Sequence, residues 1–119
     1  MIAVVDDDEP IRSALARLLR TIGYEARLYA SAETLLAELP RSSPSCVLTD
    51  IQMPGMNGLE LARELSRLAP ALPVLVMTAY PSLASRELAL AAGATEYLTK
   101  PLDDLLLEDW LREAVGPPV

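Results

Sequence analysis

The sequence of 119 residues contains no histidine and no phenylalanine, and only one cysteine and one lysine. Without histidine, and with a single cysteine, the chain cannot form the usual zinc sites or use histidine as a nucleophile or general base. Cys46 cannot form a disulfide within the chain, and its position at the start of an apolar run is typical of a small buried side chain. No apolar run approaches the ~20 residues that cross a membrane. We therefore expect a cytoplasmic protein without a membrane partner, in which any metal has oxygen ligands.

Basic residues are also scarce, with 10 of them against 17 acidic residues and a formal net charge of −7. A surface with this excess of negative charge repels phosphate backbones, so we expect no direct nucleic-acid binding by this segment. The length fits one domain, which buries roughly two-thirds of the surface that its unfolded chain would expose. Such a domain holds a hydrophobic core without the support of disulfides.

Short apolar runs alternate with helical patterns along the whole chain. The runs have the length of buried strands and occur at residues 2–5, 26–29, 46–49, 74–77 and 96–99. Each run is followed by apolar residues at helical spacing. The fourth of these patterns predicts an apolar helix face made of Ala84, Leu88, Ala91 and Ala92. This strict alternation predicts a doubly wound parallel α/β sheet with helices on both faces.

The composition of the runs predicts the order of the five strands. The first, third and fourth runs are almost entirely apolar, as central strands buried on both faces should be. The second and fifth runs carry polar residues and suit the edges; these residues are Arg27, Glu96 and Thr99. The order 2-1-3-4-5 meets this requirement and places the ligand-binding switch point between the first and third strands.

Polar side chains follow four of the five runs, at what should be one rim of the sheet. Asp6 and Asp7 follow the first run, Asp50 the third, Thr78 the fourth and Lys100 the fifth. Carboxylates gathered in one crevice repel each other unless a cation binds, and oxygen ligands suit a hard ion such as Mg²⁺. Lys100 is the only lysine, which favours a specific role for its compact charge, such as pairing with Asp50.

Four motifs occur in order along the chain: VVDDDEP at residues 4–10, LTDIQMP at 48–54, MTA at 77–79 and YLTKP at 97–101. Together with Gly58, they resemble the receiver domain of two-component response regulators, and FixJ-type receivers in particular. The resemblance covers essentially the whole chain. It implies a CheY-like (βα)5 fold, with a receiver domain at residues 1–115 and a linker or C-terminal tail beginning at residues 116–119.

The resemblance also implies the chemistry of the site. Asp50 resembles the acceptor of a phosphoryl group from the phosphohistidine of a sensor histidine kinase. Asp6, Asp7, Asp50 and the backbone carbonyl of Gln52 are implied as ligands of Mg²⁺, for which Mn²⁺ can substitute. Thr78 and Lys100 then correspond to the catalytic groups that contact the phosphoryl oxygens.

The switch is implied in the same way. Tyr97 stands at the family's aromatic switch position, and Gln52 and Tyr80 stand where side chains tune the access of water to the phosphorylated aspartate. Phosphorylation would change the face of the fourth helix, fifth strand and fifth helix, which would act on a C-terminal or separate effector, such as a DNA-binding transcription regulator outside this chain. The chain is expected to be a monomer or a homodimer promoted by phosphorylation.

Three other functions fit parts of the pattern. A phosphatase of the haloacid-dehalogenase type would carry a second aspartate where this chain has Gln52, and a nucleotide- or flavin-binding protein would need a glycine-rich phosphate loop that the chain lacks. A pseudo-receiver, which serves as an interaction scaffold without phosphorylation, would have lost part of the site, whereas this chain retains Asp7, Asp50, Thr78 and Lys100. We therefore expect a self-phosphorylating switch that is not an enzyme for other substrates, and keep the pseudo-receiver as the alternative.

Overall fold

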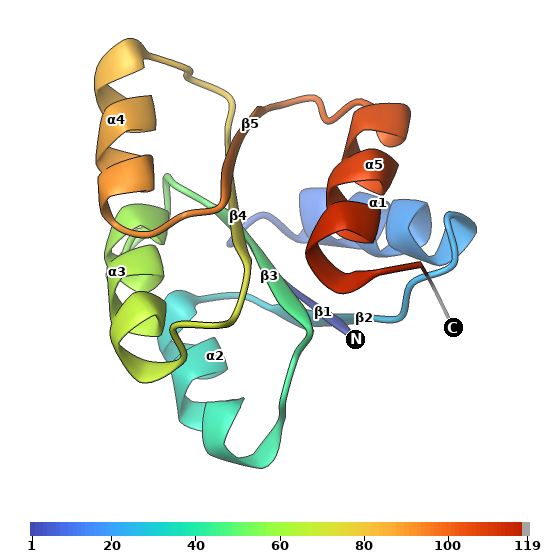
Figure 1. The fold of residues 1–119 in the computed structure, drawn as a ribbon, viewed down its shortest axis with the longest axis horizontal. Helices are drawn as coiled ribbons and strands as arrows, with labels where there is room; N and C mark the ends of the chain where they lie inside the picture. Colours follow the sequence, from blue (N-terminus) through green and yellow to red (C-terminus); the bar gives the residue numbers. More distant parts are fainter. Residues whose placement is uncertain (118–119) are drawn as a thin grey trace.

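The computed structural model describes residues 1–117 and consists of a five-stranded parallel sheet between two layers of helices (Figure 1). The strands are β1 (Ile2–Val5), β2 (Ala26–Tyr29), β3 (Cys46–Asp50), β4 (Val74–Thr78) and β5 (Glu96–Thr99). They pair in the order β2-β1-β3-β4-β5, which confirms the predicted sheet. β3 and β4 each extend one residue further than predicted, so Asp50 and Thr78 are the last residues of their strands.

The helices are α1 (Glu9–Thr21), α2 (Ala32–Glu38), α3 (Gly58–Leu68), α4 (Leu83–Ala91) and α5 (Asp104–Val115), and a short 3₁₀ turn, η1 (Leu39–Arg41), follows α2. Figure 1 shows α1 and α5 on one side of the sheet and the other three helices on the opposite side. Leu19 and Leu111 pack in the first layer, and Leu35, Leu61 and Ala89 in the second. Because both faces are covered, β1, β3 and β4 are buried along their whole length.

Each of the five α-helices begins at a side chain that caps its first turn. These side chains belong to Asp8, Ser31, Asn57, Ser82 and Asp103, and each accepts a hydrogen bond from the backbone N–H three residues later. A cap of this kind stabilises a helix by about 1 kcal/mol, so the helices that follow the site loops start at defined residues.

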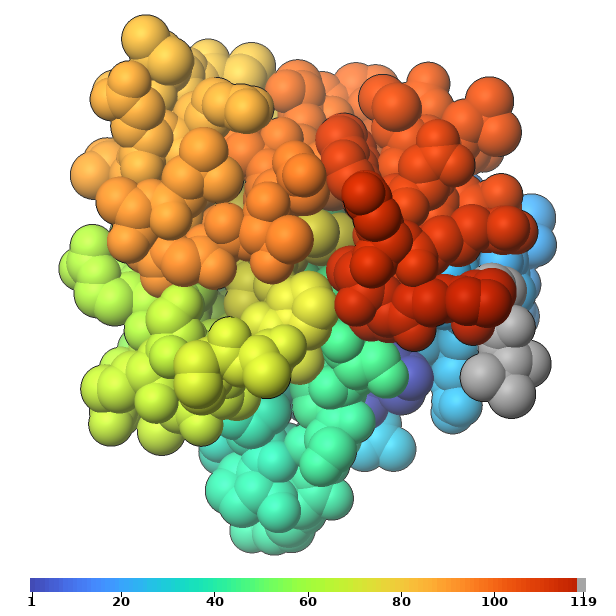
Figure 2. Space-filling model, viewed as in Figure 1, coloured from blue at the N-terminus to red at the C-terminus, as the bar shows by residue number. Residues whose placement is uncertain are grey.

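The predicted apolar face of α4 is wrong at Ala84, Leu88 and Ala91, which are exposed, and is confirmed at Ala92, which is buried. Ala89 is the buried residue of this helix, and Ala92, just after it, is buried as well. Leu88, expected in the core, is 53% exposed, and Leu83 and Leu90 are exposed too. Six of the nine positions of α4 are apolar and its polar residues are consecutive, at 85–87, so periodicity alone did not select the buried face. Ala89 faces the core, whereas Ala84 and Ala91 are exposed together with the leucines. Figure 2 shows α4 and α5 at the surface of the same face of the molecule.

The end of the chain was predicted to be a linker or tail at residues 116–119. Gly116 and Pro117 follow α5 directly, whereas Pro118 and Val119 lie outside the described residues. Within residues 1–117, none of the helices combines the length and the apolar character that a membrane span requires.

Candidate functional site

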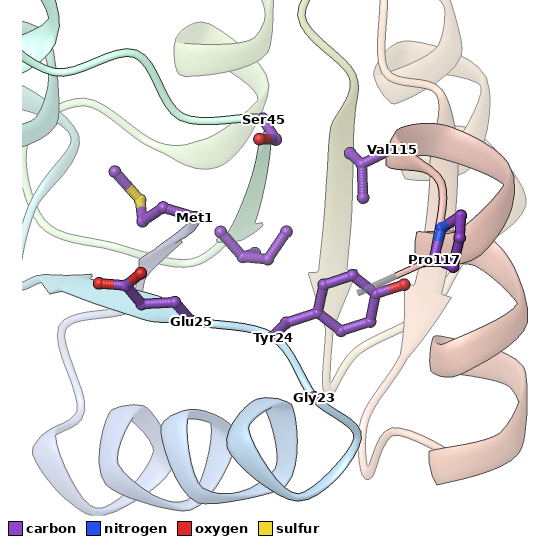
Figure 3. Close-up of a pocket in the computed structure, with 8 residues that line it drawn as sticks. Met1, Gly23, Tyr24, Glu25, Ser45, Val115 and Pro117 are labelled. Carbon is purple, nitrogen blue, oxygen red and sulfur yellow. The ribbon is translucent and has the colours of Figure 1, made fainter. Parts of the chain in front are cut away.

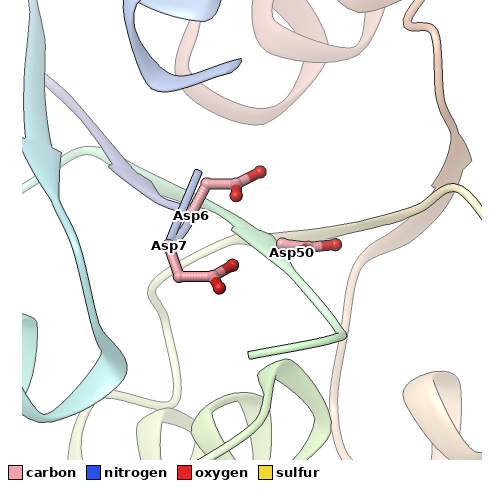
Figure 4. A group of neighbouring side chains, drawn as sticks. All are labelled: Asp6, Asp7 and Asp50. Carbon is pink, nitrogen blue, oxygen red and sulfur yellow. The ribbon is translucent and has the colours of Figure 1, made fainter. Parts of the chain in front are cut away.

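The carboxyl ends of β1 and β3 bring three aspartates together. The two strands pair in register as far as Val5 and Thr49, so Asp6 and Asp50 follow side by side. Figure 4 shows Asp6, Asp7 and Asp50 directed toward a common space. One carboxylate oxygen from each of the three lies within 4.8 Å of the others. The structure therefore gathers the three predicted acidic residues at one point.

The Asp50 carboxylate is buried at this point, with only 5% of the residue exposed. Burial raises the pKa of Asp50, the nearby charge of Lys100 lowers it, and the charge of Asp6 raises it further, so that the net direction is upward. Within residues 1–117, Asp50 Oδ1 has no hydrogen-bond partner. A buried carboxylate oxygen that has no hydrogen bond, and only the ammonium of Lys100 3.4 Å away, is costly. Together with Asp6 and Asp7 it forms an all-oxygen donor set that fits a hard divalent cation such as Mg²⁺.

Lys100 brings a positive charge to the same site. Its Nζ lies 3.4 Å from Asp50 Oδ1, as the pairing proposed from the sequence requires, but it lies closer to Asp6 Oδ2, at 2.9 Å. Burial lowers the pKa of Lys100, but the hydrogen bond to Asp6 and the charges of both aspartates outweigh it and raise the pKa overall. The Lys100–Pro101 peptide bond is cis.

Thr78 is fully buried at the end of β4 and is hydrogen bonded on two sides. Its Oγ1 donates to the side-chain Oε1 of Gln52 over 2.9 Å, and it accepts from the backbone N–H of Tyr80 over 3.0 Å. Sequence reasoning gave Gln52 a backbone carbonyl at the metal site and a side chain that tunes the access of water, but missed the contact of this side chain with Thr78. A glutamine two residues after the acidic strand end gives no local signal of which hydroxyl it will reach.

The two predicted switch residues lie in different environments. Tyr97, on β5, is buried, and its hydroxyl accepts from the backbone N–H of Ser82 over 3.2 Å and shares a hydrogen bond with Ser85 Oγ. Tyr80 is 74% exposed and reaches the site through its backbone N–H to Thr78. Tyr97 therefore lies inward against the start of α4, while the Tyr80 side chain lies in solvent.

Two further residues shape the loop between β3 and α3, and sequence reasoning missed the role of both. Glu33, in the first turn of α2, accepts a hydrogen bond from the backbone N–H of Met56 over 3.0 Å. A Cβ at Gly58 would lie 2.1 Å from the carbonyl oxygen of Asp50, so only glycine allows α3 to begin this close to the end of β3. Gly58 N also donates to the carbonyl of Ile51 over 3.0 Å.

Comparison with known proteins assigns this arrangement to a family. The family model described as the response regulator receiver domain matches residues 2–112. The DNA-binding transcriptional regulator NtrC of Salmonella typhimurium is 41% identical over 100 residues, which cover 84% of this chain and 21% of that protein. The transcriptional regulatory protein FixJ of Rhizobium meliloti is 34% identical over 111 residues, which cover 93% of this chain and 54% of that protein.

Solved structures agree with the sequence comparisons. The crystal structure of a response regulator receiver domain protein from Clostridium thermocellum matches with a TM-score of 0.90 and 30% identity. The match covers 97% of this chain and 93% of that chain. The chain thus spans nearly all of a solved receiver domain, but only about a fifth to about a half of the length of these two curated relatives.

Proposed function

Because the chain belongs to the family of response regulator receiver domains, which are signalling switches of two-component systems and not classical enzymes, we propose that Asp50 accepts a phosphoryl group from a sensor histidine kinase. The observation that carries this proposal is the buried carboxylate of Asp50, with an oxygen that has no hydrogen-bond partner within residues 1–117 and with the ammonium of Lys100 3.4 Å away. An anionic nucleophile beside a fixed positive charge suits attack on a phosphoryl group.

The transfer is a displacement at phosphorus. A carboxylate oxygen of Asp50 forms the new P–O bond while the P–N bond to the kinase histidine breaks, and the imidazole leaves with the electron pair of that bond. Asp6, Asp7, Asp50 and the backbone carbonyl of Gln52 would hold Mg²⁺, or Mn²⁺ in its place. When bound, this ion supplies positive charge to the phosphoryl oxygens.

Lys100 and Thr78 are the two side chains of this chain that would stabilise the product. The Lys100 ammonium lies 3.4 Å from Asp50 Oδ1 and can pair with a phosphoryl oxygen. The buried Thr78 hydroxyl would donate to another, after moving from its present partner Gln52. Tyr97 and the start of α4 would then rearrange, because Tyr97 bonds the loop that Thr78 begins. We also propose that the bulky Tyr80 side chain slows hydrolysis of the phosphorylated form.

The output would pass through the face formed by α4, β5 and α5. Exposed leucines lie on this face, such as Leu83 and Leu88 on α4 and Leu105 and Leu106 on α5. NtrC and FixJ are named as transcriptional regulators, and this chain spans only part of each. A DNA-binding effector, joined through residues 116–119 or acting as a separate protein, is therefore the proposed target. Pairing of two α4-β5-α5 faces would make the phosphorylated form a homodimer and the other form a monomer.

Acetyl phosphate with Mg²⁺ tests the central step. We expect intact mass spectrometry to find one added phosphoryl group on the wild-type protein, and none on Asp50→Asn or after chelation of the metal. Asp8→Asn is the matched control, because asparagine still caps α1 and the same loop loses one charge. Equal uptake by Asp50→Asn would contradict the acceptor assignment. No uptake by the wild type would favour the pseudo-receiver, an interaction scaffold without phosphorylation.

A further inference from the structure

Two consecutive hydrogen bonds connect the loop after β3 with the loop after β4. The N–H of Tyr80 donates to Thr78 Oγ1 over 3.0 Å, and Thr78 Oγ1 donates to Gln52 Oε1 over 2.9 Å. Thr78 is fully buried at the centre of this path, whereas Gln52 lies on the exposed loop. Gln52 is thus the outer end of a short path that reaches the buried end of β4.

The threonine hydroxyl has only one proton to donate. In this structure that proton is directed to Gln52, because the N–H of Tyr80 already acts as a donor to the same oxygen. The hydroxyl therefore cannot donate to an oxygen bound at Asp50 while it donates to Gln52. The side chain of Gln52 and an oxygen bound at Asp50 therefore compete for the hydrogen bond that Thr78 donates.

The loop between β4 and α4 is held at both ends by this arrangement. Thr78 holds the N–H of Tyr80 at the beginning of the loop. At its end, the Tyr97 hydroxyl holds the N–H of Ser82, the residue that caps α4. A change in the partner of Thr78 therefore acts on a loop whose other end is fixed to Tyr97.

We propose that the side chain of Gln52 is a latch: it holds the Thr78 hydroxyl in the resting arrangement and opposes its movement toward a group on Asp50. Gln52 acts through Thr78 and is thus a positioning residue in this role, separate from its backbone carbonyl. This inference rests on the proposed function, since it names what regulates the same switch. The hydrogen-bond acceptor at position 52 sets the fraction of the protein in which Thr78 has moved, at a given occupancy of Asp50 by a phosphoryl group or its mimic.

The first test measures the latch in the protein without any phosphoryl group. Gln52→Met keeps the length of the side chain and the backbone carbonyl but removes the acceptor, and Thr78→Val removes the donor. We expect the two substitutions to be non-additive in urea unfolding, with a coupling of about twofold to fivefold in the unfolding constant, because the bond is partly exposed. Thr78→Ser keeps a hydroxyl and should keep the coupling to Gln52.

Hydrogen exchange gives a local readout of the same arrangement. In Gln52→Met, the amide of Tyr80 should exchange faster by a similar factor, because its acceptor Thr78 is released. The amide of Ser82, which bonds Tyr97, serves as the reference within the same loop. Equal acceleration of both amides would indicate general loosening and would overturn the latch.

The second test loads the site with beryllofluoride and Mg²⁺, which mimic a phosphoryl group on a carboxylate. The half-saturating beryllofluoride concentration for the shift of the Thr78 and Tyr80 amide signals should be about twofold to fivefold lower in Gln52→Met than in the wild type. The latch alone would be overturned if the wild type binds beryllofluoride normally but the effects of Gln52→Met and Thr78→Val on stability are additive. It would also be overturned if Gln52→Met leaves the half-saturating beryllofluoride concentration unchanged. A wild-type protein that takes up neither beryllofluoride nor a phosphoryl group would overturn the proposed function, whatever the coupling.

Discussion

Lys100 acts on the charge of the site through two contacts. Its ammonium lies 2.9 Å from Asp6 and 3.4 Å from Asp50, between two of the three carboxylates that can hold a cation. Without a cation, this contact offsets the repulsion between the two buried acids. With one, the ammonium and the ion repel each other, because both carry positive charge.

Replacing Lys100 with methionine should therefore strengthen binding of Mg²⁺. A unit charge and a divalent ion about 5 Å apart repel by about 1.7 kcal/mol in water, so the affinity should rise on the order of tenfold. Calorimetric titration with Mg²⁺ measures this. Arg86→Met is the control, because it removes one positive charge from the exposed surface of α4 and should change the affinity far less. Equal or weaker binding by Lys100→Met would contradict the prediction.

Cys46 illustrates how burial controls the chemistry of one side chain. It begins β3, is fully buried, and burial raises the pKa of its thiol to about 12. Near pH 8 the reactive thiolate is then only about one part in ten thousand. We expect the folded protein to remain unmodified by iodoacetamide under conditions in which the urea-unfolded protein takes up one group per chain. Rapid labelling of the folded protein would show that β3 opens readily.

At the scale of elements, α2 supports a loop to which it is not joined in sequence. Glu33 bonds the N–H of Met56, in the loop that carries Gln52 away from the end of β3. This hydrogen bond lowers the pKa of Glu33 below its ordinary value of 4.5. Because the pKa is lowered, the contact stabilises the folded state fully at pH values above the ordinary pKa of 4.5. This stabilisation is lost as the pH falls through the pKa in the folded protein.

Glu33→Gln should therefore be less stable than the wild type near neutral pH, and the difference should shrink as the pH falls below the ordinary range of a glutamate. Urea unfolding of both proteins across this pH range measures the change. Glu113→Gln, at an exposed position of α5, is the matched control and should show no such trend. A difference that stays constant with pH would mean that the charge of Glu33 plays no part.

At the scale of the whole molecule, a hydrogen bond at the end of the sheet opposite the site connects the end of the chain with its first half. The hydroxyl of Tyr24, just before β2, donates to the carbonyl of Gly116 after α5, over 3.0 Å. Figure 3 shows Tyr24 beside Val115 and Pro117 in a pocket that Met1 and Ser45 also line. The contact spans 92 residues of sequence. It fixes the direction in which the chain leaves α5.

Tyr24→Phe removes only this hydrogen bond and should lower the free energy of unfolding by about 1 kcal/mol. Burial raises the pKa of Tyr24, an effect that Arg112 reduces and Glu108 increases, so the wild type favours the neutral phenol. The contribution of the Tyr24 hydroxyl to the free energy of unfolding is therefore complete at pH values below its ordinary pKa of 10.0, and is lost as the pH rises through the pKa in the folded protein. Urea unfolding should show the gap between wild type and variant closing in alkali. Tyr80→Phe, which alters an exposed hydroxyl, should change stability little, and an equal loss there would contradict the assignment.

The amino-acid sequence alone determined the architecture and the meeting of three aspartates at one edge of the sheet. The apolar runs and helical spacing predicted the five strands and their order, since burial on one or both faces leaves a direct trace in composition. The motifs at the strand ends predicted that Asp6, Asp7 and Asp50 meet, because the carboxyl ends of parallel strands share one edge. These properties depend on local pattern and topology.

Only the tertiary structure decided which polar groups pair within that site and which face of α4 is buried. Lys100 bonds Asp6 more closely than Asp50, Thr78 bonds Gln52, and Glu33 bonds the backbone of Met56. Each pairing joins residues from different elements, so it depends on the spacing of those elements and on side-chain rotamers to within an ångström. Residue type and sequence spacing carry no such information, and the packed fold is what selects among several chemically equivalent partners.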